Sequence, residues 1–222
     1  MRPLELLAPA KNLETGIAAI EHGADAIYIG AEQLGARSAA GNSVEDIAQL
    51  CQYAKQFGVK VYVTLNVIVY EHEIDYCQKL ITQLYEAGVD ALIVQDMGVL
   101  KMDIPPIELH ASTQTDNRTA DKVSWLKSLG FARVVLAREL SLDAIKAIHK
   151  QEPDVELEVF VHGALCVSYS GVCYVSQHSF GRSANRGECA QFCRMSFDLV
   201  DSDDREIEHQ RHLLSLKDMC RI

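Results

Sequence analysis

The chain has 222 residues, of which 48% are hydrophobic and 23% are charged, and its formal net charge is −10. This composition is that of a globular protein with a full hydrophobic core, which excludes a disordered or fibrous chain. The acidic balance excludes a broadly basic surface for nucleic acid, so any contact with RNA needs a local basic cluster.

One unit recurs along residues 1–164: an amphipathic helix ends at a glycine, and a short strand rich in β-branched residues follows at once. The unit is visible in "AAIEHGADAIYIG", "CQYAKQFGVKVYVTLN", "QLYEAGVDALIVQD" and "WLKSLGFARVVLARE". A left-handed conformation is expected at the glycine after each helix, which is Gly23, Gly58, Gly88 or Gly130. Further strands are expected in "LELLAPA", at 107–113 and at 155–164. About seven strands with helices between most of them predict a parallel sheet.

Two α/β folds fit this alternation, an open doubly wound sheet and a (β/α)8 barrel. No Gly-x-Gly-x-x-Gly follows the first strand, which weakens the case for a dinucleotide-binding sheet. Polar residues recur where strands end, and the carboxyl ends of barrel strands line the active site. These polar residues are Asn66, Gln95, Asp96, His110 to Gln114, Arg138, Glu139 and His162. The sequence therefore favours a TIM-barrel-like domain over residues 1–164.

The pattern changes after Ala164, and residues 165–222 are expected to form an irregular region rich in cysteine. Within it, "DSDDREIEHQRH" predicts an exposed acidic turn between two short strands. Because seven βα units are visible, we expect the eighth strand beyond residue 222, in a longer parent protein. Asp25 and Asp90 follow helix-ending glycines and are expected at the amino-terminal face of the barrel, where residues serve stability and not catalysis.

Neither a signal peptide nor a membrane span is visible in the sequence. Residues 1–20 lack an apolar stretch with a cleavage site, and no apolar run of about 18 residues occurs anywhere. We therefore expect a cytoplasmic protein without membrane contact. The sequence does not indicate an oligomeric state.

Four of the seven cysteines follow the spacing C-x6-C-x15-C-x3-C, at Cys166, Cys173, Cys189 and Cys193. In a reducing compartment, clustered cysteines are metal ligands or catalytic thiols more often than disulfides. Wide and uneven spacing favours an iron–sulfur cluster over zinc, which is usually held by closer cysteine pairs. Zinc and unligated thiols remain open at this point, and Cys220 is an alternative fourth ligand. Cys51 and Cys77 lie in helical patterns and are expected to be buried hydrophobes.

Several polar residues are candidates for catalysis. His162 stands four residues before Cys166, which permits a Cys–His pair and therefore a peptidase, although sequence proximity demonstrates no such pair. Arg138 at a strand end can clamp a small carboxylate, and an ion pair with Glu139 or Glu158 is the alternative. Asn66 ends another strand. The candidate catalytic residues are His162, Arg138 and Asn66.

Other residues are candidates for substrate binding. His110, Ser112 and Gln114 alternate along "LHASTQ", so all three are expected on one side of a strand, as substrate contacts or as a core hydrogen-bond network. Asp96 ends the strand before it. Arg182 and Arg186, with Arg194 nearby, are either a phosphate-binding patch or a polar loop whose arginines pair with carboxylates and cap helices.

Four stretches together resemble the collagenase-like peptidase family U32. They are "ELLAPAKNLETGIAAIEHGADAIYIG", "LHASTQ", "EVFVHGALCVSYSGVCYVS" and "GRSANRGECAQFCR". The family signature has the form E-x-F-x2-G-[SA]-x-C-x4–6-G-x-C-x-x-S. It is occupied here by Glu158, Phe160, Gly163, Ala164, Cys166, Gly171, Cys173 and Ser176.

The resemblance implies a barrel fold, and it implies that family members continue beyond this chain. Some members are named for collagenase activity, whereas others hydroxylate pyrimidines in 23S rRNA or tRNA, with prephenate as a co-substrate. In the hydroxylating members the four-cysteine set is implied to hold a [4Fe–4S] cluster, here at Cys166, Cys173, Cys189 and Cys193. "GRSANRGECAQFCR" is most similar to the rRNA-hydroxylating branch. The resemblance therefore predicts an RNA base hydroxylase; the alternatives are a peptidase and a non-catalytic redox or scaffold protein.

Overall fold

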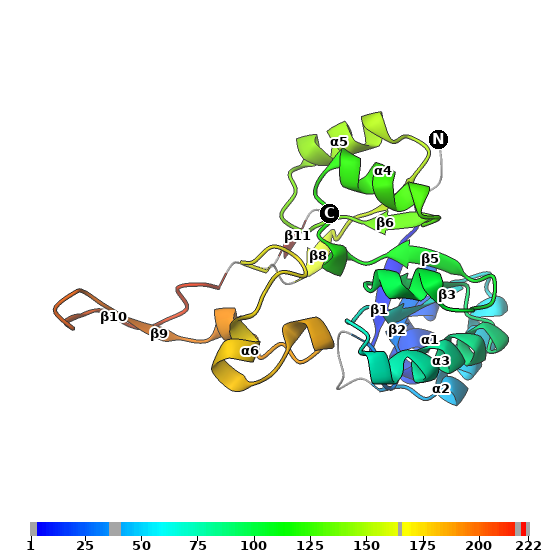
Figure 1. Ribbon diagram of the computed structural model, residues 1–222, viewed down its shortest axis with the longest axis horizontal. Helices are drawn as coiled ribbons and strands as arrows, with labels where there is room; N and C mark the ends of the chain where they lie inside the picture. The colour runs from blue at the N-terminus through cyan, green and yellow to red at the C-terminus, as the bar shows by residue number, and fades with distance from the viewer. Residues whose placement is uncertain (1–3, 36–40, 164–165, 216–218, 221–222) are drawn as a thin grey trace.

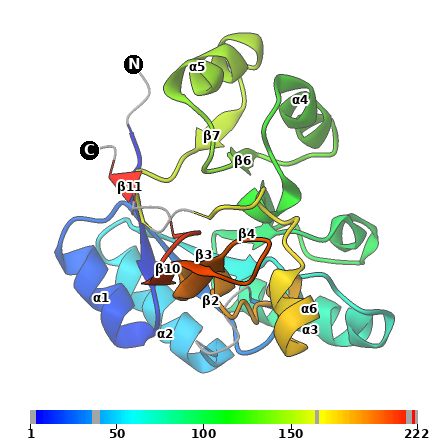
Figure 2. The ribbon, with the colours of Figure 1, turned by 90° about the vertical axis from the view of Figure 1, so that its left-hand side faces the viewer.

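The computed structural model describes residues 4–35, 41–163 and 166–215, and the backbone of 219–220. Seven strands form one parallel sheet in chain order, which curls into a half-barrel (Figures 1 and 2). They are β1 (Leu7–Ala10), β2 (Ala26–Gly30), β3 (Lys60–Leu65), β4 (Ala91–Val94), β5 (Glu108–Ala111), β6 (Arg133–Val135) and β7 (Glu156–Glu158). The predicted TIM-barrel-like α/β fold is confirmed.

Five helices cover the outer face of the sheet (Figure 2): α1 (Leu13–Glu21), α2 (Val44–Lys55), α3 (Ile74–Glu86), α4 (Ala120–Ser128) and α5 (Leu142–Gln151). The connection between β4 and β5 contains only the 3-10 helix η3 (Met97–Lys101). Four helices begin at side chains that accept a hydrogen bond from the first turn: Asn12, Ser43, Thr119 and Ser141. The four helix-ending glycines all have positive φ, as the sequence predicts.

The sheet is buried on both faces. Its outer face packs against the helices through apolar side chains such as Ile27, Val63 and Leu92, and its inner face, which lines the barrel lumen, carries Tyr62 and Ile93. Cys51 and Cys77 belong to the outer core, and burial raises the pKa of their thiols to about 12 and about 11. These two cysteines are buried hydrophobes, as expected.

Two aspartates fasten the amino-terminal ends of neighbouring strands. Asp25 Oδ2 accepts a hydrogen bond from the Leu6 amide, and Asp90 Oδ2 accepts one from the Val61 amide, both at 2.8 Å. Each aspartate precedes one strand and bonds to the backbone of the strand beside it. Their expected position at the structural face of the barrel is confirmed.

The chain leaves the barrel after β7. The strand predicted over 155–164 is confirmed as β7, but its predicted extent is wrong. β7 ends at Glu158, and β8 (His162–Gly163) pairs antiparallel with β11 (Met219–Cys220), outside the large sheet. The predicted domain boundary, residues 164 and 165, lies outside the described residues. In the described part of the chain, no helix is long and apolar enough to cross a membrane.

The cysteine-rich segment (residues 166–194) contains α6 (Val175–Phe180) and two short 3-10 helices, η5 (Ala184–Arg186) and η6 (Phe192–Arg194). It is followed by a hairpin of β9 (Phe197–Val200) and β10 (Glu206–Arg211), which projects away from the barrel (Figure 1). An acidic turn between two strands is confirmed at residues 201–205, but the predicted turn is too long, because Glu206–Arg211 of the same stretch forms β10.

Candidate functional site

A cavity of about 50 Å³ lies in the lumen at the carboxyl ends of the strands. Its walls come from β2 to β7 and the residues directly after them. The polar side chains in its lining are Tyr28, Thr64, Asn66, Ser112, Thr113 and Glu158, and the apolar ones are Ile93, Val135 and Phe160. This is the end of a barrel at which active sites are built.

Glu158, the last residue of β7, places a carboxyl group in this cavity. Its side chain is 17% exposed, and its shielded Oε2 accepts no hydrogen bond from the described residues. Arg133 Nη1 lies 3.7 Å from Oε2, beyond hydrogen-bond distance. Burial raises the pKa of this carboxyl to about 7, against the lowering effect of the Arg133 charge. At neutral pH the group is therefore divided between its acid and its carboxylate form.

Asn66 and Ser112, two of the predicted site residues, meet in the cavity wall. Asn66 Nδ2 donates to Ser112 Oγ at 3.4 Å, and this hydroxyl also accepts from the Gln114 amide at 3.1 Å. Because Ser112 directly follows β5 and caps the 3-10 turn Thr113–Thr115, Gln114 does not continue the strand. The expectation that Gln114 alternates with His110 and Ser112 on one strand is wrong.

Below the cavity, a charged network closes the amino-terminal end of the lumen. Arg133 on β6 donates to Glu5 Oε1 at 2.5 Å and to Glu156 Oε2 at 2.8 Å, and Tyr62 donates to Glu5 at 3.1 Å. Because Glu5 precedes β1, these bonds connect opposite sides of the curled sheet. The pKa of Glu5 lies below its usual value: burial acts to raise it, but the bond and charge of Arg133 lower it further.

His110 belongs to this network and not to the cavity lining. Its Nε2 lies 2.7 Å from Glu108 Oε1, and its ring packs edge-on against Tyr62 at 4.8 Å between centroids. The side chain is fully buried, and this burial lowers the pKa of the imidazole. The core-network interpretation of His110 fits these contacts.

Arg138 follows β6 at the rim of the cavity. Its guanidinium lies 4.8 Å from the centre of the Phe160 ring, which lines the cavity. Within the described residues it forms no ion pair with Glu139 or Glu158, and its shielded Nε has no hydrogen-bond partner. The structural ion pair considered from the sequence is therefore not formed there.

Both carboxylate oxygens of Asp96 accept hydrogen bonds from backbone amides. Its Oδ2 accepts from the Val69 amide at 2.9 Å, and its Oδ1 accepts from the Gly98 amide at 2.8 Å. The carboxylate thereby fixes the turns that follow β3 and β4. Asp96 shapes the rim of the barrel through these turns.

The cysteine-rich segment packs directly on this rim. Gly171 has φ +78° and lies against the turn Thr113–Thr115 that follows β5. A Cβ atom at this position would stand 1.8 Å from the Gln114 carbonyl oxygen. Beside it, the Arg118 guanidinium stacks 3.8 Å from the centre of the Tyr169 ring. The loop between Cys166 and Cys173 is therefore held over the carboxyl ends of the strands.

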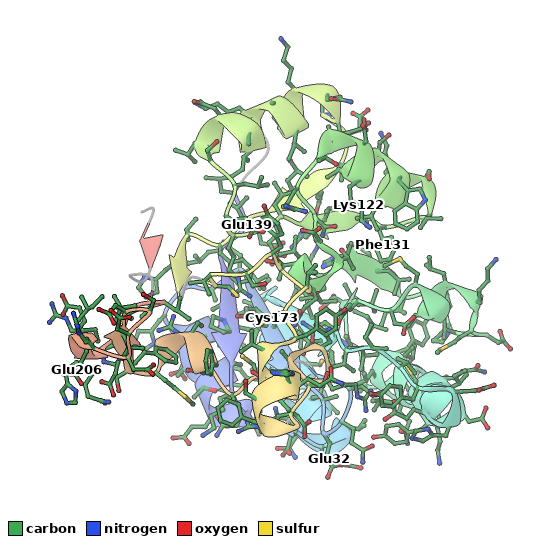
Figure 3. All side chains as sticks on the ribbon, turned by 60° about the vertical axis from the view of Figure 1, so that its left-hand side comes forward. Glu32, Lys122, Phe131, Glu139, Cys173 and Glu206 are labelled. Atoms are coloured by element: carbon green, nitrogen blue, oxygen red, sulfur yellow. The ribbon has the colours of Figure 1, made fainter. Side chains whose placement is uncertain are left out.

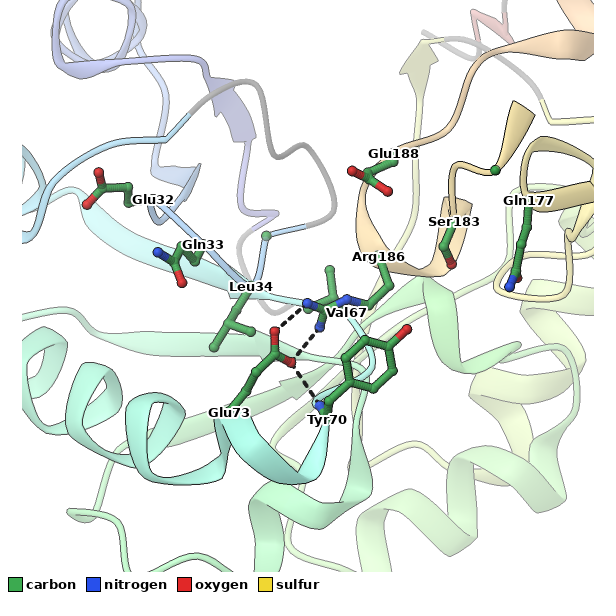
Figure 4. A pocket seen from close by; sticks show the side chains of 12 residues that line it. Glu32, Gln33, Leu34, Val67, Tyr70, Glu73, Gln177, Ser183, Arg186 and Glu188 are labelled. Atoms are coloured by element: carbon green, nitrogen blue, oxygen red, sulfur yellow. Dashed lines mark hydrogen bonds and ion pairs between the residues drawn. The ribbon is translucent and has the colours of Figure 1, made fainter. Parts of the chain in front are cut away.

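A second contact fastens the other half of the segment (Figure 4). Arg186 donates to Glu73 Oε2 at 2.8 Å, its guanidinium lies over the Tyr70 ring, and it also bonds to the Ile68 carbonyl. These groups line one side of an open hollow of about 430 Å³ between the barrel and the segment. Arg186 thus pairs with a carboxylate, the second of the two interpretations, whereas Arg182 is exposed.

Two of the four cysteines lie close enough to a third to act on its thiol. The pKa of Cys193 is raised, first by burial and then by the nearby Cys166 and Cys189. Figure 3 shows Cys173 beside the carboxyl ends of the barrel strands. Among the described residues, no three of these sulfurs lie within 4.8 Å of one another, whereas a tetrahedral zinc site brings them to about 3.8 Å. Whether these four thiols hold an iron–sulfur cluster or a zinc ion stays a prediction from their spacing in the sequence.

His162 and Cys220 stand apart from the cavity lining. The two residues are paired in the backbone register of β8 and β11, and the His162 side chain is exposed. The expectation that His162 ends a barrel strand is wrong, because β8 is outside the sheet. The Cys220 side chain lies outside the described residues, so its part as an alternative ligand stays a prediction.

Sequence reasoning missed Glu158 as a titratable group and Arg133 as its neighbour. Glu158 is part of "EVFVHGALC", but its charge gives no sign of burial. A signal was present in "ARVVLARE" and "VELEVF", where Arg133, Glu156 and Glu158 alternate in apolar strands. Charged residues at alternate positions of barrel strands point into the lumen.

The fold and site define a TIM-barrel-like protein with a four-cysteine segment over the carboxyl ends of its strands. Residues 11–222 match the family model described as peptidase family U32. The chain belongs to this family. The solved structure of the U32 peptidase Mk0906 shares the fold with a TM-score of 0.61, at 14% identity over 97% of this chain and 92% of that one.

Curated relatives of the family match over most of this chain. The 23S rRNA 5-hydroxycytidine C2501 synthase of Escherichia coli is 56% identical over 97% of this chain and 33% of that protein. The tRNA hydroxylation protein P1 of Bacillus subtilis is 41% identical over 90% of this chain and 48% of that protein. A collagenase of Porphyromonas gingivalis is 36% identical over 98% of this chain and 56% of that protein. The chain thus spans about a third to about half of the length of these relatives.

Proposed function

We propose that this chain is part of an enzyme that hydroxylates a pyrimidine base of rRNA or tRNA. The observation that carries the proposal is its 56% identity to an rRNA 5-hydroxycytidine synthase, together with its 41% identity to a tRNA hydroxylation protein. Its substrate would be RNA and its location the cytoplasm, where these RNAs are found. Mass spectrometry of rRNA and tRNA distinguishes the two possible substrates.

The proposal includes a [4Fe–4S] cluster held by Cys166, Cys173, Cys189 and Cys193. Support comes from the donor set and from the influence of Cys166 and Cys189 on the Cys193 thiol. When bound, such a cluster supplies one-electron chemistry. Gly171 and Arg186 hold the two halves of the segment against the barrel, next to the lumen cavity.

The residues at the rim have separate parts in this proposal. Arg138 has a shielded Nε without a partner in the described chain, so it is suited to bind a carboxylate of a small co-substrate such as prephenate. Asn66 and Ser112 present an amide and a hydroxyl to the cavity and can orient a bound ring by hydrogen bonds. Phe160 supplies an aromatic surface between Arg138 and the cavity.

The cluster is tested by anaerobic purification. Wild-type protein is expected to absorb near about 400 nm and to contain about four iron and four sulfide per chain. Cys166→Ala and Cys189→Ala are expected to lose most of this absorbance, whereas Cys51→Ala, in the hydrophobic core, keeps it. A colourless wild-type protein without iron or sulfide contradicts the cluster.

The activity is tested by mass spectrometry of rRNA and tRNA from a strain that lacks the gene. One hydroxylated pyrimidine is expected to disappear, to return with the wild-type gene, and to stay absent with Arg138→Met. If every hydroxylated pyrimidine persists in the deletion strain, RNA hydroxylation by this protein is wrong.

A second candidate function is peptidase activity, which the similarity to the collagenase favours. A cysteine peptidase requires an imidazole in hydrogen-bond reach of the thiol. In the described part of the chain, the exposed His162 forms no such bond with Cys166. Cleavage of gelatin by the purified protein that survives Cys166→Ala and Cys173→Ala would favour a peptidase with a different nucleophile.

A further inference from the structure

Of the described residues that line the lumen cavity, Glu158 alone carries a carboxyl group. Nearby carboxylates are occupied: Glu5 and Glu156 bond to Arg133, and Asp96 bonds to two backbone amides. Glu158 Oε2 lies at ion-pair distance from Arg133 Nη1, 3.7 Å away, but this shielded oxygen accepts no hydrogen bond from the described residues. A buried polar atom of this kind costs stability unless a ligand or water satisfies it.

We propose that the Glu158 carboxyl group contacts the Watson–Crick edge of the substrate base, which enters the lumen cavity from the carboxyl ends of the strands. The inference rests on the proposed function and names the residue that binds its substrate base. Enzymes that modify a base take it out of the stack and contact this edge in a pocket. A cavity of about 50 Å³ admits the edge of a base and not the whole ring.

The hydrogen-bonding groups of the Glu158 carboxyl group and of a pyrimidine edge are complementary. The edges of cytosine and uracil each present one hydrogen-bond donor beside one acceptor: N4–H and N3 in cytosine, N3–H and O4 in uracil. A protonated carboxyl group offers one donor and one acceptor side by side, so it pairs with either base through two hydrogen bonds. The rings of Phe160 and Tyr28 line the same cavity and provide surfaces for stacking.

The surroundings of Glu158 favour its protonated form near neutral pH. Burial raises its pKa to about 7; the charge of Glu5 raises it as well, and that of Arg133 lowers it. Burial lowers the pKa of His110, and Tyr28 faces the cavity from β2. When Glu158 ionises it loses its donor and retains acceptors only, so base binding weakens as the pH rises through about 7.

The test measures binding of anaerobically purified protein to two fluorescent RNAs of about ten nucleotides. One is oligouridylate, and the other is the same oligomer built from 3-methyluridine, which is uncharged but carries a methyl group on the contacted edge. At about pH 6, wild-type protein is expected to prefer oligouridylate by about tenfold, as expected for two hydrogen bonds to a base edge. At about pH 8 the preference falls to about threefold or less.

Three variants separate the possible roles of the side chain. Glu158→Gln keeps one donor and one acceptor at every pH, so its preference is expected to persist at about pH 8. Glu158→Leu is expected to show no preference at either pH, and the exposed rim variant Glu139→Gln is expected to behave as wild type. A preference that survives in Glu158→Leu, or one that Glu158→Gln loses, overturns the inference. Because Glu158→Gln has nearly the volume of the native residue, its result stands even if Glu158→Leu does not fold.

The outcome is distinguishable from failure of the proposed function. If the deletion strain loses a hydroxylated pyrimidine but the purified protein does not distinguish the two RNAs, only the contact by Glu158 is wrong. If the preference is found and every hydroxylated base persists in the strain, the base site stands and the hydroxylation is wrong.

Discussion

The two ends of the barrel lumen differ in how their polar groups are satisfied. At the amino-terminal end, Arg133 bonds to Glu5 and Glu156, and Glu5 also accepts from Tyr62. At the carboxyl end, Glu158 and Arg138 each have a shielded polar atom without a hydrogen-bond partner in the described chain. The buried His110 Nδ1 at the amino-terminal end also lacks a hydrogen-bond partner in the described chain, but the charged groups Arg133, Glu5 and Glu156 there are paired with one another.

This difference separates stability from binding. A buried charge with good partners is costly to disrupt, because removing one partner leaves the others uncompensated. A buried polar group without a partner costs stability in the free protein and is available to a ligand. We therefore expect substitutions at the amino-terminal end to unfold the protein, and substitutions at the carboxyl end to change binding with little loss of stability.

The largest effect is expected from Arg133→Met. This change leaves Glu5 and Glu156 without their cation in a partly buried site, so the free energy of unfolding should fall by about 3 kcal/mol. The estimate lies at the low end for buried pairs because the Glu5 and Glu156 side chains are 27% and 52% exposed. Urea denaturation measures it, with the exposed Arg205→Met as a control expected to change by less than about 0.5 kcal/mol. Equal losses in the two variants would mean that the network contributes nothing.

Much of the sheet and of the amino-terminal end of the barrel could be predicted from the sequence. The repeat of helix, glycine and strand predicted the parallel sheet, because burial on both faces leaves a continuous apolar pattern in each strand. Asp25 and Asp90 were placed correctly because they occupy one position of that repeat. The partners of Arg133 could not be predicted, since Glu5 is 128 residues away and their contact depends on the curl of the sheet.

The carboxyl end was harder to predict, because it is built from turns. Gln114 followed a strand-like alternation, but the Ser112 hydroxyl caps a 3-10 turn and ends the strand. His162 lay in an apolar run that the structure divides between β7 and β8. The role of the four cysteines as ligands was predicted from their spacing and from the family resemblance, and it stays a prediction. The position of their segment over the barrel depends on contacts at Gly171 and Arg186 that no local pattern encodes.

An effect of at most similar size is expected from pH acting on Glu158. Its pKa is about 7 in the folded protein and ordinarily 4.5, so the folded state binds more protons than the unfolded state between these values. The free energy of unfolding therefore falls as the pH rises across this window, by about 3 kcal/mol at most. Glu5 has a lowered pKa, so its stabilising contribution is lost only as the pH falls below its ordinary value.

Glu158→Gln isolates this contribution, because it retains the volume of the side chain but does not titrate. Relative to the wild type, the variant should gain stability steadily from about pH 4.5 to about pH 7 and remain level above it. Urea denaturation at a series of pH values gives the difference, in which the titration of all other groups cancels. A difference that does not vary with pH would show that Glu158 ionises as readily in the folded protein as in the unfolded chain.

The smallest of these effects concerns the cover of the carboxyl end and is tested by two glycines with similar backbone angles. Gly171 has φ +78° and Gly181 has φ +64°, so Ala at either position costs about 1 kcal/mol for the left-handed conformation. At Gly181 a Cβ atom meets nothing within 4 Å, whereas at Gly171 it collides with the Gln114 backbone. Gly171→Ala should therefore cost about 1 kcal/mol more than Gly181→Ala.

The extra cost should appear locally, because the collision forces the loop between Cys166 and Cys173 away from the rim. Hydrogen exchange is expected to accelerate in this loop and at the turn after β5 in Gly171→Ala, and to remain at wild-type rates there in Gly181→Ala. The amides bonded to Asp25 and Asp90, at the opposite end of the barrel, should keep their protection in both variants. Equal exchange in the two variants would show that the cysteine-rich segment does not rest on the β5 turn, and that the carboxyl end of the lumen is open to solvent.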